Sequence, residues 1–400
     1  MKKLLLLGGS HYLLPVIEAA HDLGLHAITC DYLPDNAAHK FSDEYHNVSI
    51  IDKEAVLELA KELKIDGVIS FACDPGVATA AYVAEKLGLP AAGPYESVAL
   101  LQDKTKFRNF LRDNGFNVPK AFGFECIDDA LNKADSFDYP VVVKPVDSAG
   151  SKGVSRVNGP HELKAGIENA LAFSHCGRFI IEDFIEQKGY ASDTECFTVN
   201  GPLVFASFNN QHFDRSADNP YTPAGCGWPS SMEQCHQDTL RSELQRLMKL
   251  LNMGSSVYNV ETRVGTDNKP YIMEVSPRGG GNRLCEMLRY ACGTDLIRAA
   301  VKAAVGMPVD EMSDPVYKGS WAEVILHSNR PGTFRRLDIH EDVRPWVVEE
   351  QMWVKDGDVV EGFTGANKTI GTLVLNFPSQ EELEKRMNDL DSWLTVVVED

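Results

Sequence analysis

Long apolar runs and basic residues are both scarce in this 400-residue chain. The longest apolar stretch near the N-terminus is the LLLL of residues 4–7, far short of the roughly 20 residues that cross a membrane. Acidic residues outnumber basic ones, 58 to 39, and the formal net charge is −19. Nucleic-acid binding needs a basic surface. We therefore expect no membrane span and no nucleic-acid partner, although a local Lys/Arg cluster could still bind a small anion.

Cysteine spacing excludes two further classes of protein. The nine cysteines are scattered, and no C-x-x-C pair occurs among them. This pattern argues against a zinc site and against a disulfide framework, and it is typical of a reducing compartment. Met1-Lys2-Lys3 and the leucines could begin a signal peptide, but residues 10–24 after them have the pattern of an ordinary amphipathic helix. We expect a cytoplasmic protein.

Familiar catalytic and nucleotide fingerprints are also missing. The first glycine turn has only Gly8 and Gly9, so it matches the G-x-G-x-x-G of dinucleotide-binding proteins weakly. No Walker A sequence occurs, and no Ser-His-Asp or Cys-His signature for nucleophilic catalysis is present. A nicotinamide-dependent oxidoreductase remains an alternative, supported by the first α/β unit alone.

Strand and helix patterns alternate over residues 1–93, which predicts a doubly wound α/β domain. Ligands of such domains bind at the carboxyl ends of the strands. Four polar or small residues fall there: Gly9, Ser10, Asp31 and Asp74. They could contact a small molecule, but capping and turn formation explain them equally well.

The rest of the chain reads as a second, larger unit and a small terminal one. We expect a helix over 96–114, a strand–glycine loop–strand over 140–157, and a hairpin that turns at Asn200-Gly201. A helix over 237–253 precedes a second hairpin, and two helices follow it. From about residue 311, short strands with glycine turns precede a helix over 379–394.

The second hairpin carries two carboxylates. If it is symmetric about its polar turn (265–270), Val264 lies opposite Tyr271, and Glu261 lies opposite Glu274. Opposed Cβ atoms of an antiparallel pair are about 4.5–5.5 Å apart, and like charges there repel. A shared proton, a nearby Lys or Arg, or a divalent cation would compensate, and paired oxygen ligands suit Mg²⁺. Two solvated surface acids, or another register, are the alternative.

Basic and glycine-rich segments flank these acids. Arg278 follows the second strand and could reach an anion. Gly279–Gly281 would allow a ligand to approach the backbone closely. Lys144 lies in the apolar strand VVVKPV, where a buried lysine needs a partner, although an edge-strand lysine could reach water. The loop DSAGSKG after it could direct N–H groups and Lys152 toward phosphates, or it could be a plain turn.

Together these segments resemble the ATP-grasp superfamily. The segments are QDKTKFRNFLRDNGFNVP, YPVVVKPVDSAGSKGV, FIIEDFIE, and NVETRV with YIMEVSPRGGGN. The resemblance rests on the order of these segments along the sequence, and it covers nearly the whole chain. It implies an α/β fold with an N-terminal domain (1–93), an ATP-grasp α+β core (94–310) whose lid spans about 120–186, and a small β-rich C-terminal domain (311–400). Biotin carboxylase, the carbamoyl-phosphate synthetase large subunit and glycinamide ribonucleotide synthetase have similar arrangements.

The resemblance also implies a role for each matched residue. Lys104, Lys144 and the loop Ser148–Gly153 would hold the ATP phosphates, and the connector from Glu182 to Ile185 would clasp adenine. Glu261 and Glu274 would bind Mg²⁺ or Mn²⁺. Arg278, with Lys144, would be catalytic and would stabilise charge on the transferred phosphoryl group. The complete nucleotide-binding set is Lys104, Lys144, Ser148, Gly150, Ser151, Lys152, Gly153, Glu182, Asp183, Phe184 and Ile185.

Two departures from the family pattern leave questions open. Ser276 replaces an asparagine that often binds metal, which puts a second metal in doubt, and Asn282 might compensate. The ribose-binding acid could be Asp193 or Glu195. His212 lies in a Gly/Pro-rich stretch that could border the substrate; as a plain loop histidine it needs no such role.

The implied reaction is ATP-dependent joining of a small carboxylate to an amine through an acyl phosphate, with release of ADP and phosphate. By analogy the enzyme could be a homodimer. The substrate would lie between residues 1–93 and the Arg278 region, where Arg283 and Arg289 could meet an anion. A catalytically inactive nucleotide-binding regulatory module is the rival from another class. Carboxylation and thiol acylation are alternatives within the superfamily.

Overall fold

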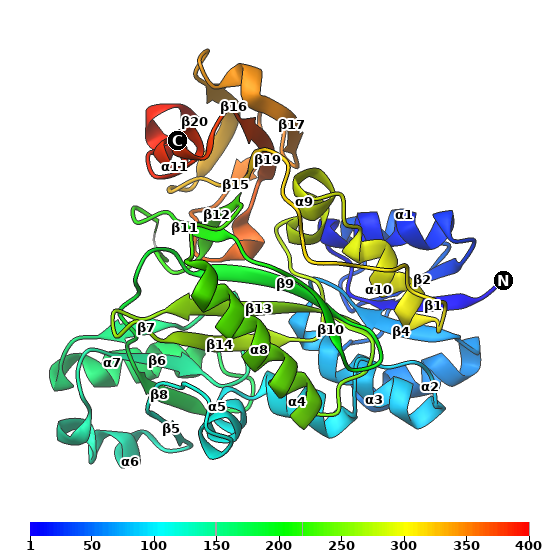
Figure 1. The fold of residues 1–400 in the computed structure, drawn as a ribbon, viewed down its shortest axis with the longest axis horizontal. Helices are drawn as coiled ribbons and strands as arrows, with labels where there is room; N and C mark the ends of the chain where they lie inside the picture. Colours follow the sequence, from blue (N-terminus) through cyan, green and yellow to red (C-terminus); the bar gives the residue numbers. More distant parts are fainter. Residues whose placement is uncertain (149, 218, 400) are drawn as a thin grey trace.

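The N-terminal domain is a parallel four-stranded sheet in the order β3-β2-β1-β4. The computed structural model describes residues 1–148, 150–217 and 219–399 of the chain, and Figure 1 shows their arrangement. The strands are β1 (Lys3–Leu7), β2 (His26–Cys30), β3 (Glu44–His46) and β4 (Gly67–Ser70). The helices are α1 (Leu14–Asp22), α2 (Lys53–Leu63) and α3 (Val77–Leu87). Strand β1 is almost wholly buried, as expected for a strand covered on both faces.

Two helices, rather than the single one expected over 96–114, lead out of this domain. They are α4 (Tyr95–Gln102) and α5 (Lys104–Asp113). Asp103 separates them because its backbone is extended (φ −106°, ψ 107°) and its side chain accepts a hydrogen bond from the Lys106 N–H. It is an N-cap in the middle of the predicted helix. The predicted end at Gly115 is correct, since that glycine has φ +71°.

A small antiparallel sheet in the order β5-β8-β6-β7 corresponds to the predicted lid. Its elements are β5 (Ala121–Phe124), α6 (Ile127–Leu131), β6 (Val141–Pro145), β7 (Ser155–Val157), α7 (Pro160–Ala172) and β8 (Phe179–Asp183). Helix α7 contributes Leu163 and Ile167 to a core that contains Val141 and Val143. Lys144, between such apolar positions, therefore points away from this core.

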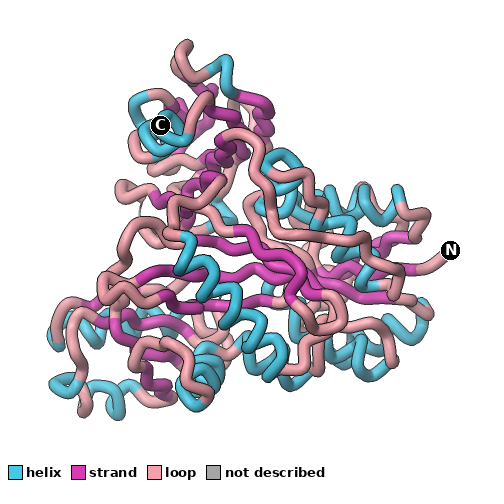
Figure 2. Tube along the Cα trace, viewed as in Figure 1, coloured by secondary structure: helices cyan, strands magenta, loops and turns pink. Residues whose placement is uncertain are grey.

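The central sheet has the order β10-β9-β13-β14 and is covered on one face by α8 (Figures 1 and 2). The elements are β9 (Ser192–Thr198), β10 (Leu203–Ser207), α8 (Gln234–Leu250), β13 (Ser256–Val264) and β14 (Pro270–Ser276). Asn200 and Gly201 form the β9–β10 turn with positive φ, as predicted. Tyr258 and Val260 pack under α8, so alternate residues of β13 face the other way.

Two more sheets complete the described chain, and one of them corrects an expectation. The elements are β11 (Asn210–Phe213), β12 (Pro223–Trp228), α9 (Leu284–Ala291), α10 (Leu296–Ala304), β15 (Ser320–Leu326), β16 (Gly332–Ile339), β17 (Val347–Met352), β18 (Val359–Val360), β19 (Gly371–Phe377), α11 (Gln380–Met387) and β20 (Leu394–Glu399). The sheet orders are β11-β12-β15-β19-β17 and β18-β16-β20. The Gly/Pro-rich stretch after residue 209 is thus largely a hairpin, not a loop, and the last predicted helix ends at Met387.

Glycines of β12 explain why that hairpin joins the terminal sheet. An added Cβ at Gly225 would lie 2.7 Å from Met387 Cε, and one at Gly227 would lie 2.9 Å from Leu383 Cδ2. Helix α11 can therefore pack on this strand only because side chains are missing there. The same glycines led to the wrong prediction that this stretch is a loop.

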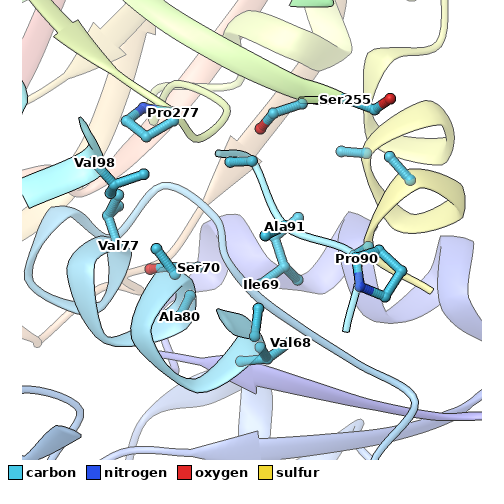
Figure 3. Close-up of a pocket in the computed structure, with 17 residues that line it drawn as sticks. Val68, Ile69, Ser70, Val77, Ala80, Pro90, Ala91, Val98, Ser255 and Pro277 are labelled. Carbon is cyan, nitrogen blue, oxygen red and sulfur yellow. The ribbon is translucent and has the colours of Figure 1, made fainter. Parts of the chain in front are cut away.

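The N-terminal domain meets the core along α3, β4 and α10. Small side chains line this junction and leave a cavity of about 40 Å³. Figure 3 shows Ser70, Val77 and Ala80 on one side of it, with Ser255 and Pro277 on the other. The cavity can hold a water molecule but not a substrate. Among the described residues, no helix has the length and apolarity needed to cross a membrane.

Candidate active site

Three carboxylates form a row across the face of the central sheet opposite α8. Glu274 pairs with Glu261, and Glu261 pairs with Asp193 of β9. Lys104 Nζ lies 3.2 Å from Glu274 Oε1, and Arg263 forms an ion pair with Glu261. Burial would raise the pKa of Glu261, but Arg263 and Lys144 hold it below its usual value. The predicted pairing of Glu261 with Glu274 is confirmed, and nearby cations compensate the repulsion.

The register near the turn differs from the symmetric hairpin expected. Val264 pairs with Pro270, and Arg263, not Val264, pairs with Tyr271. A β-bulge between Glu261 and Thr262 then shifts the register by one residue. The shift brings Glu261 opposite Glu274.

Helix α5 supplies two cations that connect the lid to the central sheet. Lys104 Nζ donates to Ser148 O (3.0 Å) and to Glu274. Arg108 Nε donates to Glu182 Oε2 (2.8 Å), and Arg108 Nη1 donates to Met273 O (2.6 Å). The sequence analysis missed Arg108. Its spacing of four residues from Lys104, on the same helix face, was the available signal.

Glu182 is the acid that pairs with Arg108 of α5. Its side chain is only 2% exposed and also pairs with Lys144. Burial alone would raise the pKa of Glu182, but Arg108 and Lys144 reverse the effect and lower it. The Glu182 side chain is therefore already engaged, and its expected contact with adenine stays a prediction.

The glycine loop after β6 touches the segment that leads into β12. Gly150, Ser151 and Gly153 all have φ between +59° and +70°. Ser151 Oγ donates to Tyr221 O (2.9 Å), and Asn219 Nδ2 donates to Ser151 O (3.0 Å). Ala149, within the predicted loop Ser148–Gly153, lies outside the described residues. Lys152 follows directly after Ser151 in this loop.

The connector after β8 is fixed at both ends by the backbone. Phe184 N donates to Pro140 O (3.2 Å), Asp183 N donates to Lys120 O (2.9 Å), and Thr266 N donates to Glu186 O (2.9 Å). Arg156 lies over the Phe184 ring at 4.3 Å. The side chain of Ile185 reaches the β13–β14 turn near Gly265. The connector thus spans lid and central sheet, and its expected contact with adenine stays a prediction.

Arg278 pairs with Asp74 of the N-terminal domain. Arg278 Nε and Nη2 lie 2.9 and 2.7 Å from the two Asp74 oxygens, and Ser276 Oγ donates to Asp74 Oδ1 (2.7 Å). Burial opposes ionisation of Asp74, but Arg278 and Ser276 hold its pKa below the usual value. Of the residues at the strand ends of this domain, Asp74 is therefore joined to the predicted site.

Asp31, Gly279 and Asn282 each contact neighbouring groups of the protein. Asp31 accepts from Leu33 N and Asn36 Nδ2, which is turn formation. Gly279 closely approaches a protein side chain: an added Cβ would lie 2.2 Å from Phe71 Cζ. Asn282 accepts from the Tyr12 hydroxyl (2.9 Å). Ser276 and Asn282 are thus both hydrogen-bonded within the protein.

Two buried acids of this region differ in their hydrogen-bond partners. Glu195 accepts from Gly280 N (3.1 Å), Asn259 Nδ2 (2.8 Å) and Cys285 Sγ (2.7 Å). Glu323 on β15 is fully buried, and neither of its oxygens has a partner among the described residues. Burial raises the pKa of Glu323 well above its usual value. The sequence analysis missed Glu323, although a lone acid in the apolar strand SWAEVIL was a signal like that of Glu274.

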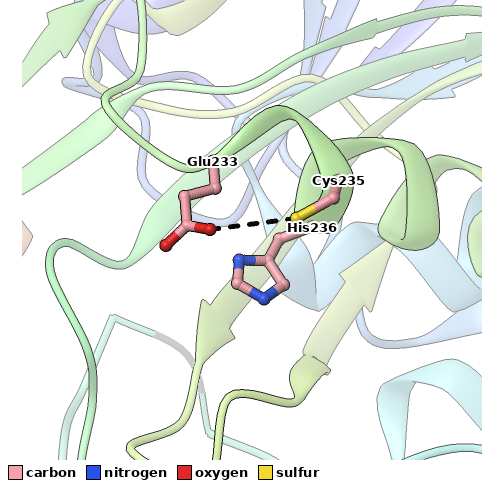
Figure 4. A group of neighbouring side chains, drawn as sticks. All are labelled: Glu233, Cys235 and His236. Atoms are coloured by element: carbon pink, nitrogen blue, oxygen red, sulfur yellow. Dashed lines mark hydrogen bonds between the residues drawn. The ribbon is translucent and has the colours of Figure 1, made fainter.

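The donor set of Glu261 and Glu274 fits a magnesium ion. Both are oxygen donors on adjacent strands, and their side chains are 31% and 39% exposed, so solvent reaches them. Figure 4 shows another group of potential ligands, Glu233, Cys235 and His236, at the start of α8. Glu233 is the N-cap of α8, and the positive N-terminal end of a helix disfavours a cation there. The carboxylate pair is therefore the better metal site.

A large groove of about 840 Å³ lies elsewhere, between β11, β15 and the C-terminal strand β20. His212 lines it and is 5% exposed. Its Nε2 has no hydrogen-bond partner among the described residues. The histidine is thus a buried strand residue, not the loop residue expected. The groove is lined by none of the predicted nucleotide or metal ligands, so the carboxylate row stays the candidate active site.

Comparison with known proteins identifies the central segment. Residues 101–282 match the ATP-grasp domain family. The carbamoyl phosphate synthase large chain of Ralstonia nicotianae is 25% identical over 64% of this chain, which spans 24% of that protein. The formate-dependent phosphoribosylglycinamide formyltransferase of Bacteroides thetaiotaomicron is 25% identical over 80% of this chain and 86% of that protein.

Solved structures agree in fold over the whole chain. The L-amino acid ligase of Bacillus licheniformis superposes with a TM-score of 0.79 at 21% identity, covering 100% of this chain and 99% of that one. Phosphoribosylglycinamide synthetase from Anaerococcus prevotii has a TM-score of 0.74 at 19% identity, with both chains fully covered. The chain thus has the fold of these ligases, and its residues 101–282 match the ATP-grasp domain.

Proposed function

We propose that this protein is an ATP- and Mg²⁺-dependent ligase that joins a small carboxylate to an amine. The observation that carries the proposal is the convergence of Lys104, Lys144, Glu261, Glu274 and Arg278 around one face of the central sheet. A regulatory module without chemistry has no need of a paired-carboxylate site beside an arginine. Relatives from several ligase classes share the fold.

Some of these residues would bind the nucleotide, and others would bind the metal ion. Lys104 and Lys144 would bind ATP phosphates, and the backbone of the connector Glu182–Ile185 would receive adenine. Between the two ribose candidates, Asp193 suits the role better, because Gln211 holds one of its oxygens, whereas Glu195 is held by Gly280, Asn259 and Cys285. Glu261 and Glu274 would hold Mg²⁺, which neutralises charge on the phosphates when bound.

The chemistry consists of two substitutions. A substrate carboxylate oxygen attacks the γ-phosphorus, the bond to the β-phosphate oxygen breaks, and ADP leaves. The amine nitrogen then attacks the acyl carbon of the acyl phosphate, phosphate departs with the bridging oxygen, and the nitrogen loses a proton. Arg278 would neutralise the carboxylate and then the acyl phosphate. Positioning and charge neutralisation suffice, so no nucleophilic side chain is required.

Hydroxylamine tests the reaction class without knowledge of the amine. It captures acyl phosphates as hydroxamates, so Mg·ATP, a panel of small carboxylates and hydroxylamine should give ADP and hydroxamate in equal amounts. ADP without hydroxamate for every acid, or no ADP at all, would contradict the proposal.

We also propose that the ligase acts in the cytoplasm as a homodimer. One of the structural neighbours, a 2-oxoglutarate carboxylase biotin carboxylase domain, is described as a dimer. Light scattering on the purified protein should give twice the 44.2 kDa chain mass. A mass equal to one chain would exclude the dimer.

A further inference from the structure

The carboxylate of Asp103 binds two different parts of the chain with its two oxygens. Oδ1 accepts from the Lys106 N–H (3.0 Å) and caps helix α5. Oδ2 accepts from Arg178 Nη2 (2.8 Å), and Arg178 belongs to the lid and directly precedes β8. The Asp103 side chain is only 10% exposed, and that of Arg178 is 33% exposed. A single carboxylate therefore joins the start of α5 to the lid.

Arg178 is firmly connected to the beginning of the glycine loop. Val146 N donates to Arg178 O (3.3 Å), and the Asp147 carboxylate accepts from Cys176 N (2.8 Å). Ser174 Oγ lies within hydrogen-bond distance of both Asp147 Oδ1 (3.0 Å) and Arg178 O (2.9 Å). These bonds hold the segment before β8 and the segment after β6 as one unit. The position of Arg178 therefore fixes where the glycine loop begins.

Lys104, the residue after Asp103, contacts the same part of the lid. Its N–H donates to Val146 O (3.1 Å), and its Nζ donates to Ser148 O (3.0 Å) and to Glu274 (3.2 Å). Lys104 and the loop that begins at Ser148 are the proposed phosphate ligands. Asp103 thus lies where these ligands from two parts of the chain come together, although its own negative charge repels phosphate.

We propose that Asp103 is a positioning residue for the nucleotide and that it acts through its ion pair with Arg178. The pair holds the beginning of the glycine loop beside Lys104, so that the loop and the lysine reach the phosphates of one ATP molecule. This inference rests on the proposed ligase function and concerns the same nucleotide site.

Charge and position lead to opposite expectations for Asp103→Asn. Asparagine caps a helix as well as aspartate does, so α5 keeps its N-cap, while the amide nitrogen faces Arg178 and the ion pair is lost. The change also removes a negative charge beside Lys104, which by electrostatics alone strengthens the binding of phosphates. Release of the glycine loop weakens it instead. We expect Kd for Mg·ATP to rise roughly fivefold, the upper end for a partly exposed ion pair.

Isothermal titration calorimetry with Mg·ATP and with adenosine provides the test. Asp103→Asn, Arg178→Gln and the double variant should each raise Kd for Mg·ATP. The double variant should raise it no further than the single changes, because all three lack the same pair. Kd for adenosine, which has no phosphate, should stay the same. The matched control is Glu168→Gln, which breaks an ion pair with Lys164 within lid helix α7 and should bind Mg·ATP like the wild type.

Each outcome decides between the two claims. Unchanged or tighter binding of Mg·ATP by Asp103→Asn, additive losses in the double variant, or an equal loss of adenosine binding would overturn the positioning role and leave the ligase function standing. A wild type that does not bind Mg·ATP would overturn the ligase function, and this inference with it. If Asp103→Asn unfolds at a lower temperature than the wild type without ligand, Arg178→Gln replaces it, because that variant keeps the N-cap. Weaker Mg·ATP binding with unchanged adenosine binding is then the supporting result.

Discussion

Several acidic side chains of this protein lie in buried or partly buried positions, and a cation pairs with each of them. Glu182 is held by Arg108 and Lys144, Asp74 by Arg278, and Glu274 by Lys104. The first two pairs are largely buried, whereas Glu274 is 39% exposed. Exposed ion pairs contribute little to stability. Glu274 therefore serves function more than folding.

Glu274→Gln should abolish ADP formation while the fold persists. The amide is nearly isosteric but loses the charge that binds Mg²⁺, so we expect a rate loss of about 1,000-fold or more and an unchanged circular dichroism spectrum. Coupled-enzyme detection of ADP measures the rate. Glu233→Gln is the control, since it alters the other group of potential ligands (Figure 4). Wild-type turnover by Glu274→Gln would show that the metal site is wrongly assigned.

His212 predicts a pH dependence of stability. Burial lowers its pKa to about 4, whereas an unfolded histidine has a pKa of about 6.5. Between these values the unfolded chain binds the extra proton, so stability rises with pH and is lost as the pH falls from 6.5 toward 4. The loss from this one group amounts to about 3 kcal/mol.

Urea unfolding of wild type and His212→Gln at pH 7 and pH 4.5 checks this expectation. The free energy of unfolding of the wild type should fall more between the two pH values than that of the variant. Equal falls would mean that His212 is accessible to protons in the folded protein.

At the scale of elements, one β-bulge and two loops position the residues of the candidate site. The β13–β14 bulge brings Glu261 opposite Glu274, and the loop after β14 packs on the loop after β4. The packing relies on Gly279, whose missing side chain leaves room for Phe71. The position of Arg278 relative to Asp74 thus depends on contact between two domains.

Gly279→Ala should disturb this contact. The new methyl group would overlap the Phe71 ring, and overpacking of this kind costs about 1–3 kcal/mol. We expect a lower Tm and a raised KM for the carboxylate, because Asp74 and Arg278 move apart. Gly281→Ala is the matched control, since the nearest atoms, on Tyr12, would be 3.8 Å away. Identical behaviour of the two variants would contradict the proposed role of Gly279.

The elements also show how far the sequence predicts this structure. Periodicity and turn residues located the α/β domain, the Asn200-Gly201 hairpin and the facing carboxylates, because these features depend on local pattern. Asp103 escaped notice because an N-cap between two helices resembles a polar helical residue. The hairpin of β11 and β12 was missed because the glycines of β12 make room for α11, which lies some 150 residues further along the chain. Contacts between distant segments, such as that of Asp74 with Arg278, produce no pattern in the local sequence from which they could be predicted.

At the scale of the whole molecule, three parts of the chain meet around the proposed nucleotide site. The lid contributes Lys144 and Glu182, the central sheet contributes Glu261 and Glu274, and the N-terminal domain reaches Arg278 through Asp74. The glycine loop touches Asn219 and Tyr221, which lie between β11 and β12 of the five-stranded sheet. A ligand bound at their junction should therefore stabilise the folded molecule as a whole.

Thermal unfolding with Mg·ATP, ATP plus EDTA, and NADH tests this central claim most directly. Ligand at 100 times its Kd adds about 2.7 kcal/mol of stability, which raises Tm by several degrees. We predict a rise with Mg·ATP only, and its loss in Lys144→Ala, where Arg108 remains to pair with Glu182 and preserve the fold. A rise with NADH and none with Mg·ATP would contradict the account and favour an oxidoreductase built on the first α/β domain.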